Sequence, residues 1–263
     1  MPDLRHRALA ALALASPAEK CAALRAIPAD CRLDPNASLS TEVPLPGRES
    51  RPHLVMPRDV PQRSLATLEG RAALIHALAH IELNAVNLAL DIVWRFADLP
   101  EKFYRDWLGV ACEEADHFDL LAAHLATMGY AYGDFPAHDG LWQMAEKTAD
   151  DALARIALVP RILEARGLDV SPQIRAKLAS AGDKAGAAIL DIILRDEIGH
   201  VALGNYWYHW LCAARGLDPL AADAMLAAQY GAPRQRGPFN LSARRAAGFT
   251  DAELAALDSG TPL

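Results

Sequence analysis

The residues of this sequence whose types and spacing could do chemistry are two Glu-x-x-His pairs, Glu114–His117 and Glu197–His200. Residues three apart on an α-helix share a face, so each pair would present a carboxylate beside an imidazole. Carboxylate and imidazole are both ligands for transition metals. One such pair in a chain with nine histidines arises easily by chance, so a single pair carries little weight.

A second regularity strengthens the pattern. Glu82 precedes Glu114 by 32 positions, and Glu164 precedes Glu197 by 33 positions. The sequence therefore reads Glu, then Glu-x-x-His, twice, which is the ligand set of a dinuclear carboxylate site inside a four-helix bundle. We predict a metal site with six ligands: Glu82, Glu114, His117, Glu164, Glu197 and His200.

The faces that carry these residues are otherwise apolar; Glu82, for example, shares its face with Leu78 and Val86. Acidic side chains that face a core are very costly unless they are paired or bind a metal. Four carboxylates would balance the charge of two divalent ions. Imidazole with carboxylate favours iron, with manganese or a mixed iron/manganese pair as alternatives. The competing interpretation is surface acids and core histidines, and for Glu164 an ion pair with Arg161.

Four further residues are candidates for contacts around this site. Asp116 and Asp196 neighbour the predicted ligands and could orient a ligand histidine, although solvent exposure is an equal alternative. His80 follows His76 at helical spacing but points roughly opposite to Glu82. Arg161 could meet an anionic substrate. We predict no catalytic residue beyond the metal ligands.

The elements that position these residues are predicted to be helices. The composition is 52% hydrophobic, rich in Ala and Leu, with little of the alternation that strands show. We predict an all-α protein, a ferritin-like four-helix bundle over 67–216. An N-terminal helical and Pro-rich wrapping extension would cover 1–66, and a C-terminal helical extension 217–263.

Within the bundle, long helices are predicted over 67–97 and from Pro100 to Gly129. A third helix would end at Gly167 and be kinked by Pro160, and the fourth would run from about Asp183 to Arg215. Glu164 would then lie at the end of its helix. Residues 167–182 are therefore predicted to form a short extra helix folded back beside the bundle.

Charge and cysteine usage limit the partners. A net charge of −7 gives no basic field for nucleic acid. The C-terminal arginines are interpreted as a solvated tail docking on an acidic surface; they are Arg234, Arg236, Arg244 and Arg245. Four scattered cysteines without a CxxC pair favour reduced thiols and a cytoplasmic location. No apolar run reaches the ~20 residues of a membrane span, so we expect no membrane partner.

Several stretches carry a resemblance to a known family. They are Leu54–Pro61, Ala79–Leu83, Glu113–Phe118, Ala137–Trp142, Val159–Asp169, Arg195–Val201 and Gly237–Asn240. In these the chain resembles the ferritin-like proteins grouped as domain-of-unknown-function 455, and all six ligand positions fit. The resemblance implies a ferritin-like fold and a di-metal site, without an agreed activity. More distantly the chain is similar to rubrerythrins, bacterioferritins and di-iron tRNA hydroxylases, an analogy by fold.

Three hypotheses about function follow. The leading one is a di-iron oxidoreductase that uses dioxygen or peroxide and a small-molecule substrate, as a monomer or homodimer. The second is a non-enzymatic metal-binding or iron-handling protein. The third is an RNA-modifying hydroxylase, which the acidic balance disfavours.

Overall fold

The computed structural model describes residues 3–233 and 235–258. Within these ranges the regular elements are helices, apart from one isolated bridge between Leu54 and Ala137, so the all-α prediction is confirmed. The chain divides into two compact units, 1–140 and 141–263. The boundary between them falls inside the stretch 67–216 that was predicted as one bundle.

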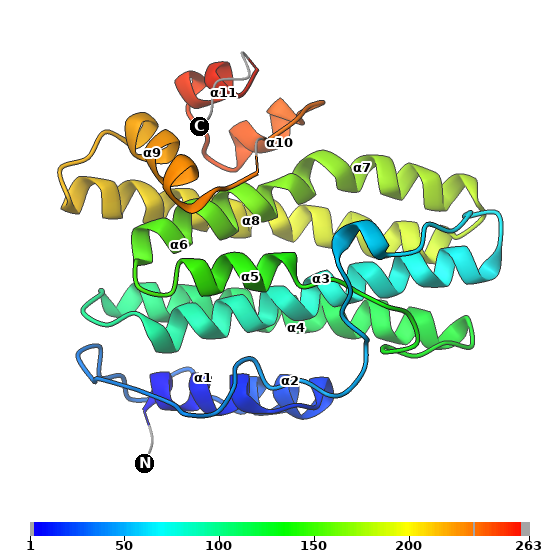
Figure 1. Cartoon of the computed structure of the whole chain (residues 1–263), viewed down its shortest axis with the longest axis horizontal. Helices are drawn as coiled ribbons and strands as arrows, with labels where there is room; N and C mark the ends of the chain where they lie inside the picture. Colours follow the sequence, from blue (N-terminus) through cyan, green and yellow to red (C-terminus); the bar gives the residue numbers. More distant parts are fainter. Residues whose placement is uncertain (1–2, 234, 259–263) are drawn as a thin grey trace. The chain divides into compact units, whose positions relative to one another are not determined.

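The centre of the first unit is the helix pair α3 (Leu68–Arg95) and α4 (Glu101–Thr127), which lie side by side (Figure 1). Helix α3 begins where the Thr67 hydroxyl accepts a hydrogen bond from the Gly70 N–H at 3.0 Å. Pro100 caps α4 just before its first residue. Both predicted helices are confirmed to within two residues at these ends.

Helix α3 is long and apolar enough to cross a membrane by length and composition alone. However, 78% of its most apolar window is buried inside the structure. Burial of this kind is the behaviour of a core helix in a soluble protein.

Helices α1 (Leu4–Ala13) and α2 (Pro17–Arg25) precede the Pro-rich segment 28–66, whose one helical piece is η1 (Pro57–Asp59). The fully buried Arg5 ties α1 and this segment to the end of α3. Its guanidinium donates to the carbonyls of Trp94 at 2.8 Å and Ala37 at 2.7 Å. The Pro-rich segment is therefore anchored to the helices of its own unit.

The apolar residues Leu54 and Met56 of this segment do not hold it by burial, since they are 42% and 54% exposed. Backbone hydrogen bonds hold the segment instead: the Val55 N–H donates to the Ala137 carbonyl, and the Ala137 N–H donates to the His53 carbonyl.

The second unit contains α5 (Gly140–Lys147), whose first residue closes the first unit, then α6 (Ala152–Leu158) and the π-helical turn η2 (Val159–Glu164). Helix α7 (Ala165–Ser180) follows directly and pairs with α8 (Lys184–Ala214) (Figure 1). The kink expected at Pro160 takes the form of this wide turn, a known response to a missing N–H.

The prediction that Gly167 ends the third helix was wrong. The residues predicted as an extra helix, 167–182, are helical up to Ser180, but they belong to α7, which begins at Ala165 and follows η2 without a break. Helix α7 continues through both Gly167 and Pro172. A glycine inside a helix costs only about 1 kcal/mol, which packing against α8 outweighs. Pro172 cannot donate to the carbonyl of Leu168, but the Asn240 amide donates to that carbonyl at 3.2 Å.

Three C-terminal helices complete the second unit: α9 (Pro219–Tyr230), α10 (Leu241–Ala246) and α11 (Asp251–Asp258). Arg244, predicted to lie in a solvated tail, is fully buried and pairs with Asp169 at 2.8 Å. Arg245 pairs at the surface with Asp251, and Arg234 lies outside the described residues. The tail is therefore anchored in the core through Arg244, which corrects that interpretation.

Candidate metal centre

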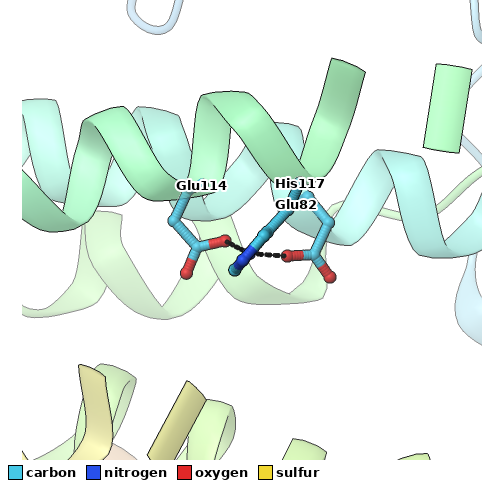
Figure 2. Close-up of side chains that lie close together, drawn as sticks. All are labelled: Glu82, Glu114 and His117. Carbon is cyan, nitrogen blue, oxygen red and sulfur yellow. Dashed lines mark hydrogen bonds and ion pairs between the residues drawn. The ribbon is translucent and has the colours of Figure 1, made fainter. Parts of the chain in front are cut away.

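The clearest site in the first unit is a cluster of Glu82, Glu114 and His117 (Figure 2). The Nδ1 atom of His117 lies 3.4 Å from Oε2 of Glu82 and 3.4 Å from Oε2 of Glu114. Glu82 comes from α3, and the other two residues come from neighbouring turns of α4. The imidazole thus sits between two carboxylates from facing helices.

All three side chains are buried, with exposed fractions of 6% for Glu82, 1% for Glu114 and 2% for His117. Burial alone would lower the pKa of His117. The hydrogen bonds and charges of Glu114 and Glu82 outweigh it and raise this pKa to about 10. Without a metal, the imidazole is therefore protonated at neutral pH and acts as the counter-ion of the two carboxylates.

This geometry suits a cation. One ligand atom from each of the three residues lies within 4.8 Å of the other two, close enough for one ion to contact all three. A divalent ion between them would take the place of the imidazole proton, because a histidine ligand must be neutral. Two carboxylates and one imidazole are the donor set expected for iron or manganese.

The second unit repeats part of this arrangement. His200 is 2% exposed, and its Nδ1 lies 3.3 Å from Oε2 of Glu197, both on α8. Gly167 on α7 faces this glutamate: a Cβ placed there would meet Glu197 Cγ at 3.8 Å. Helix α7 therefore passes α8 at the level of the Glu-x-x-His pair.

Glu164 is the last residue of the π turn. Its position lies between Pro160, which contacts Gly204 of α8, and Gly167, which contacts Glu197. Glu164 therefore lies between two points at which this stretch of the chain contacts α8. Within the described residues of this unit, however, its half-buried carboxylate does not form a three-ligand cluster with Glu197 and His200 like that of the first unit.

The four surrounding candidates fall in different places. Asp116 is exposed and pairs with Arg25 at 2.7 Å, whereas Asp196 pairs with the adjacent Arg195. His80 is buried; its Nδ1 lies 2.7 Å from the Tyr132 hydroxyl and its Nε2 3.1 Å from the His138 carbonyl. None of these contacts is to a predicted ligand histidine, and the orienting role of Asp116 and Asp196 stays a prediction.

Arg161 is fully buried and bonds elsewhere than predicted. It pairs with Asp223 on α9 at 2.8 Å and with Glu253 on α11, and it donates to Asn205 Oδ1 at 2.8 Å. These two carboxylates, rather than Glu164, balance its charge, and burial leaves it closed to an anionic substrate. Sequence reasoning missed Asp223 and Glu253 as its partners because no local pattern links residues 62 and 92 positions away. Thr250 and Glu253 have the Thr-x-x-Glu spacing of a capping box, and the structure forms its two reciprocal hydrogen bonds.

The structure thus defines an all-helical protein with a buried glutamate–histidine cluster that could hold a metal ion. The chain belongs to the family described as a protein of unknown function, DUF455, whose model matches residues 13–255. It is 54% identical over 211 residues to an uncharacterised protein of Haemophilus influenzae, an alignment that covers 78% of this chain and 73% of the relative. No solved structure gives a significant match. The family resemblance seen in the sequence is confirmed.

Proposed function

We propose that this protein is a di-metal carboxylate oxidoreductase with a ferritin-like bundle, in which each helical hairpin supplies one glutamate and one Glu-x-x-His pair to two metal ions. Iron is the first choice of metal. The observation that carries the proposal is the buried cluster of Glu82, Glu114 and His117, with three ligand atoms within 4.8 Å of one another. One imidazolium provides a single positive charge for two buried carboxylates, so a divalent ion would balance the charge of this cluster more completely.

The second helical hairpin, in which α6, η2 and α7 lie against α8, is evidence for two metal ions rather than one. Its Glu197–His200 pair repeats the Glu114–His117 pair in contact distance, 3.3 Å against 3.4 Å. Both pairs also lie at the same depth in their helices, since Glu114 and Glu197 each stand thirteen positions after the first helical residue. A symmetrical dinuclear centre requires that both helices carry the same ligands at the same position along their length.

A pair of reduced iron ions would supply electrons to dioxygen or peroxide, which is chemistry that no side chain here provides. The chain's own contribution is to hold the ligands and to move a proton. His117 must give up its Nδ1 proton when a cation enters, and the apolar surroundings of α3 and α4 exclude water from the ligands. Glu82 and Glu114 keep their negative charge directed at one point.

Metal content tests the first half of the proposal. Protein purified without added metal, analysed by elemental analysis, is expected to contain two iron ions per chain. The Glu114→Gln variant should lose metal, whereas Glu113→Gln, an exposed neighbour on the same helix, should retain it. Retention of two ions by Glu114→Gln would contradict the site.

Oxygen chemistry tests the second half. Anaerobic protein loaded with Fe(II) and then exposed to oxygen should consume oxygen and develop a visible absorption change, and Glu114→Gln should do neither. Two bound ions without oxygen or peroxide consumption would leave the metal site standing and remove the oxidoreductase, in favour of the iron-handling alternative.

A further inference from the structure

A second site of a different kind lies in the first unit. A pocket of about 240 Å³ opens between the start of α2, the segment 47–54 and one face of α3. The α3 residues that line it include His80, Asn84 and Asn87, which recur at helical spacing. Glu82 does not line it, so the pocket is separate from the glutamate–histidine cluster.

Lys20 is the unusual residue of this pocket. It is only 2% exposed, and its Nζ donates to Asn87 Oδ1 at 2.5 Å and to the Gly47 carbonyl at 3.1 Å. Both acceptors are neutral, and no carboxylate in the described part of the chain forms an ion pair with it. Burial, followed by the charge of Arg48, lowers the pKa of Lys20 to about 7. A buried ammonium without a counter-ion is costly, and an anion in the pocket would relieve that cost.

Asn84, also in this pocket, needs a hydrogen-bond donor rather than an anion. It is 3% exposed, and its amide N–H donates to the His80 carbonyl at 2.8 Å. Its Oδ1 is buried and accepts no hydrogen bond from the described residues. Buried acceptors are almost always satisfied, so this oxygen marks the place of a hydrogen-bond donor. The same pocket therefore lacks both an anion and a donor.

The charged groups at the rim of the pocket balance one another, and its floor is neutral. Arg48 is paired with Asp139 at 2.6 Å, and Arg51 is matched by the lining acid Glu49, so Lys20 is, among the residues that the structure describes, the cation of this pocket without a carboxylate partner. On the floor, burial lowers the pKa of His80 to about 4, so its ring is neutral. Its Nε2 lies within hydrogen-bond distance of the His138 carbonyl, so Nδ1 is the atom that accepts from the Tyr132 hydroxyl.

Size and charge narrow the ligand. At roughly 30 Å³ per water, the pocket holds about eight waters, which limits a ligand to roughly ten non-hydrogen atoms. An amino acid would satisfy Asn84 with its ammonium group but would bring a second cation beside Lys20. A hydroxyl group satisfies Asn84 without that repulsion. Pro17 and Leu83 line the apolar part of the wall, where a short carbon chain fits.

We propose that this pocket binds a small 2-hydroxycarboxylate, with the carboxylate paired to Lys20 and the hydroxyl donating to Asn84 Oδ1. The frame that holds the pocket is rigid at Gly47. Its N–H donates to the Leu12 carbonyl at 2.9 Å while its own carbonyl accepts from Lys20. A Cβ there would lie 2.1 Å from the Ala13 carbonyl oxygen, so only glycine fits.

Calorimetric titration of the full chain with four compounds tests the ligand class: lactate, propionate, alanine and inorganic phosphate. Lactate should bind with saturation, and propionate, which lacks the hydroxyl, at least tenfold more weakly. Alanine should also bind more weakly than lactate. Absence of lactate binding, or tighter binding of alanine or phosphate than of lactate, would overturn the proposal.

Variants test the two contacts. Lys20→Met should weaken lactate binding at least a hundredfold while its melting temperature stays equal or rises, because an unpaired buried charge has been removed. Asn84→Ala should bind lactate no better than propionate, a readout that remains valid if Lys20→Met fails to fold. The matched control is Lys102→Met, an exposed lysine of the same unit, which should bind as the wild type does.

A 2-hydroxycarboxylate also chelates iron, so the pocket must be separated from the metal site. Lactate binding should persist in Glu114→Gln, which alters the metal ligands and leaves the pocket intact. Loss of binding in that variant together with unchanged binding in Lys20→Met would assign the lactate to the metal and refute the pocket.

Discussion

The two helical hairpins carry the same ligand pattern on different supports. In the first, α3 and α4 are long regular helices, and Glu82 lies thirteen positions before the end of α3. In the second, the partner of α8 is not one regular helix but three consecutive pieces: α6, the π turn η2 and α7. Glu164 lies sixteen positions before the end of α7. The same spacing of glutamates is thus built from unequal parts.

The supports differ in chemistry as well as in shape. In the first hairpin, Glu82 and Glu114 flank His117, and the Glu114 side chain is 2% exposed. The second depends on a buried ion-pair network in which Arg161 joins the π turn to α9 and α11, and its Glu197 side chain is 12% exposed. The same pattern of Glu and Glu-x-x-His is therefore compatible with two different ways of holding a helix in place.

The largest expected effect on stability comes from breaking the buried ion-pair network of Arg161 in the second hairpin. Arg161→Met leaves the carboxylates of Asp223 and Glu253 buried without a cation, which should cost about 3–5 kcal/mol of unfolding free energy. Urea unfolding measures this change. Arg245→Met, at an exposed pair with Asp251, is the control and should leave stability nearly unchanged. Equal stability of Arg161→Met and wild type would show that the network does not brace the hairpin.

Next in size is the loss of a metal ligand on either hairpin. Glu114→Gln and Glu197→Gln should each weaken iron binding at least a hundredfold, about 2.7 kcal/mol, if the hairpins are equivalent halves of one centre. Competition with a chelator measures the affinities. A large loss in Glu114→Gln beside no loss in Glu197→Gln would confine the site to the first hairpin.

A smaller effect is the pH dependence of stability that His117 gives to the first hairpin. The pKa of His117 is raised to about 10 in the metal-free fold, against an ordinary value of 6.5. Its contribution to stability is therefore complete below pH 6.5 and declines as the pH rises toward 10, by at most about 1.4 kcal/mol per unit. Metal-free wild type should lose melting temperature between pH 7 and 9 more than metal-free His117→Gln. Metal binding should release a proton, so metal affinity should rise with pH.

The smallest effect concerns the glycines of α7 and α8. A Cβ at Gly167 meets only ordinary contacts at 3.8 Å, so Gly167→Ala should stabilise the chain by roughly 0.5–1 kcal/mol through helix propensity. Gly204 is tighter, since a Cβ would lie 3.3 Å from Cβ of Pro160. Gly204→Ala should therefore stabilise less or destabilise. Thermal unfolding compares the two, and a destabilising Gly167→Ala would indicate that this residue does end a helix.

Local signals in the sequence predicted most of the helices and the two Glu-x-x-His pairs, because helical periodicity and capping act over a few residues. The Asp218–Pro219 start of α9 and the Thr250–Glu253 cap are examples. Long-range contacts were not predictable. Gly167 was read as a helix end, but α7 packs against α8 and continues through it. The Asn240 amide donates to the Leu168 carbonyl, to which Pro172 has no N–H to donate.

The same limit applies to the buried charges. Arg161 and Arg244 were expected to face a substrate and the solvent, and no pattern in the sequence marked Lys20 as buried, since charged residues are almost never fully buried without a partner. Their positions inside the fold depend on residues far away in sequence: Asp223, Asp169 and Asn87. The six predicted metal ligands remain a prediction for the centre as a whole, with the cluster of the first unit as its structural basis.

The apolar character of α3 has a consequence for biosynthesis. During synthesis, α3 leaves the ribosome as an apolar segment long enough to span a membrane. Other parts of the chain must cover it quickly, because an uncovered segment of this kind resembles a transmembrane helix. Helix α1, which packs on α3, has already been synthesised by then, whereas α4 follows later. The N-terminal helices therefore act as a ready cover for the nascent core, and a chain that lacks residues 4–25 should associate with chaperones or membranes.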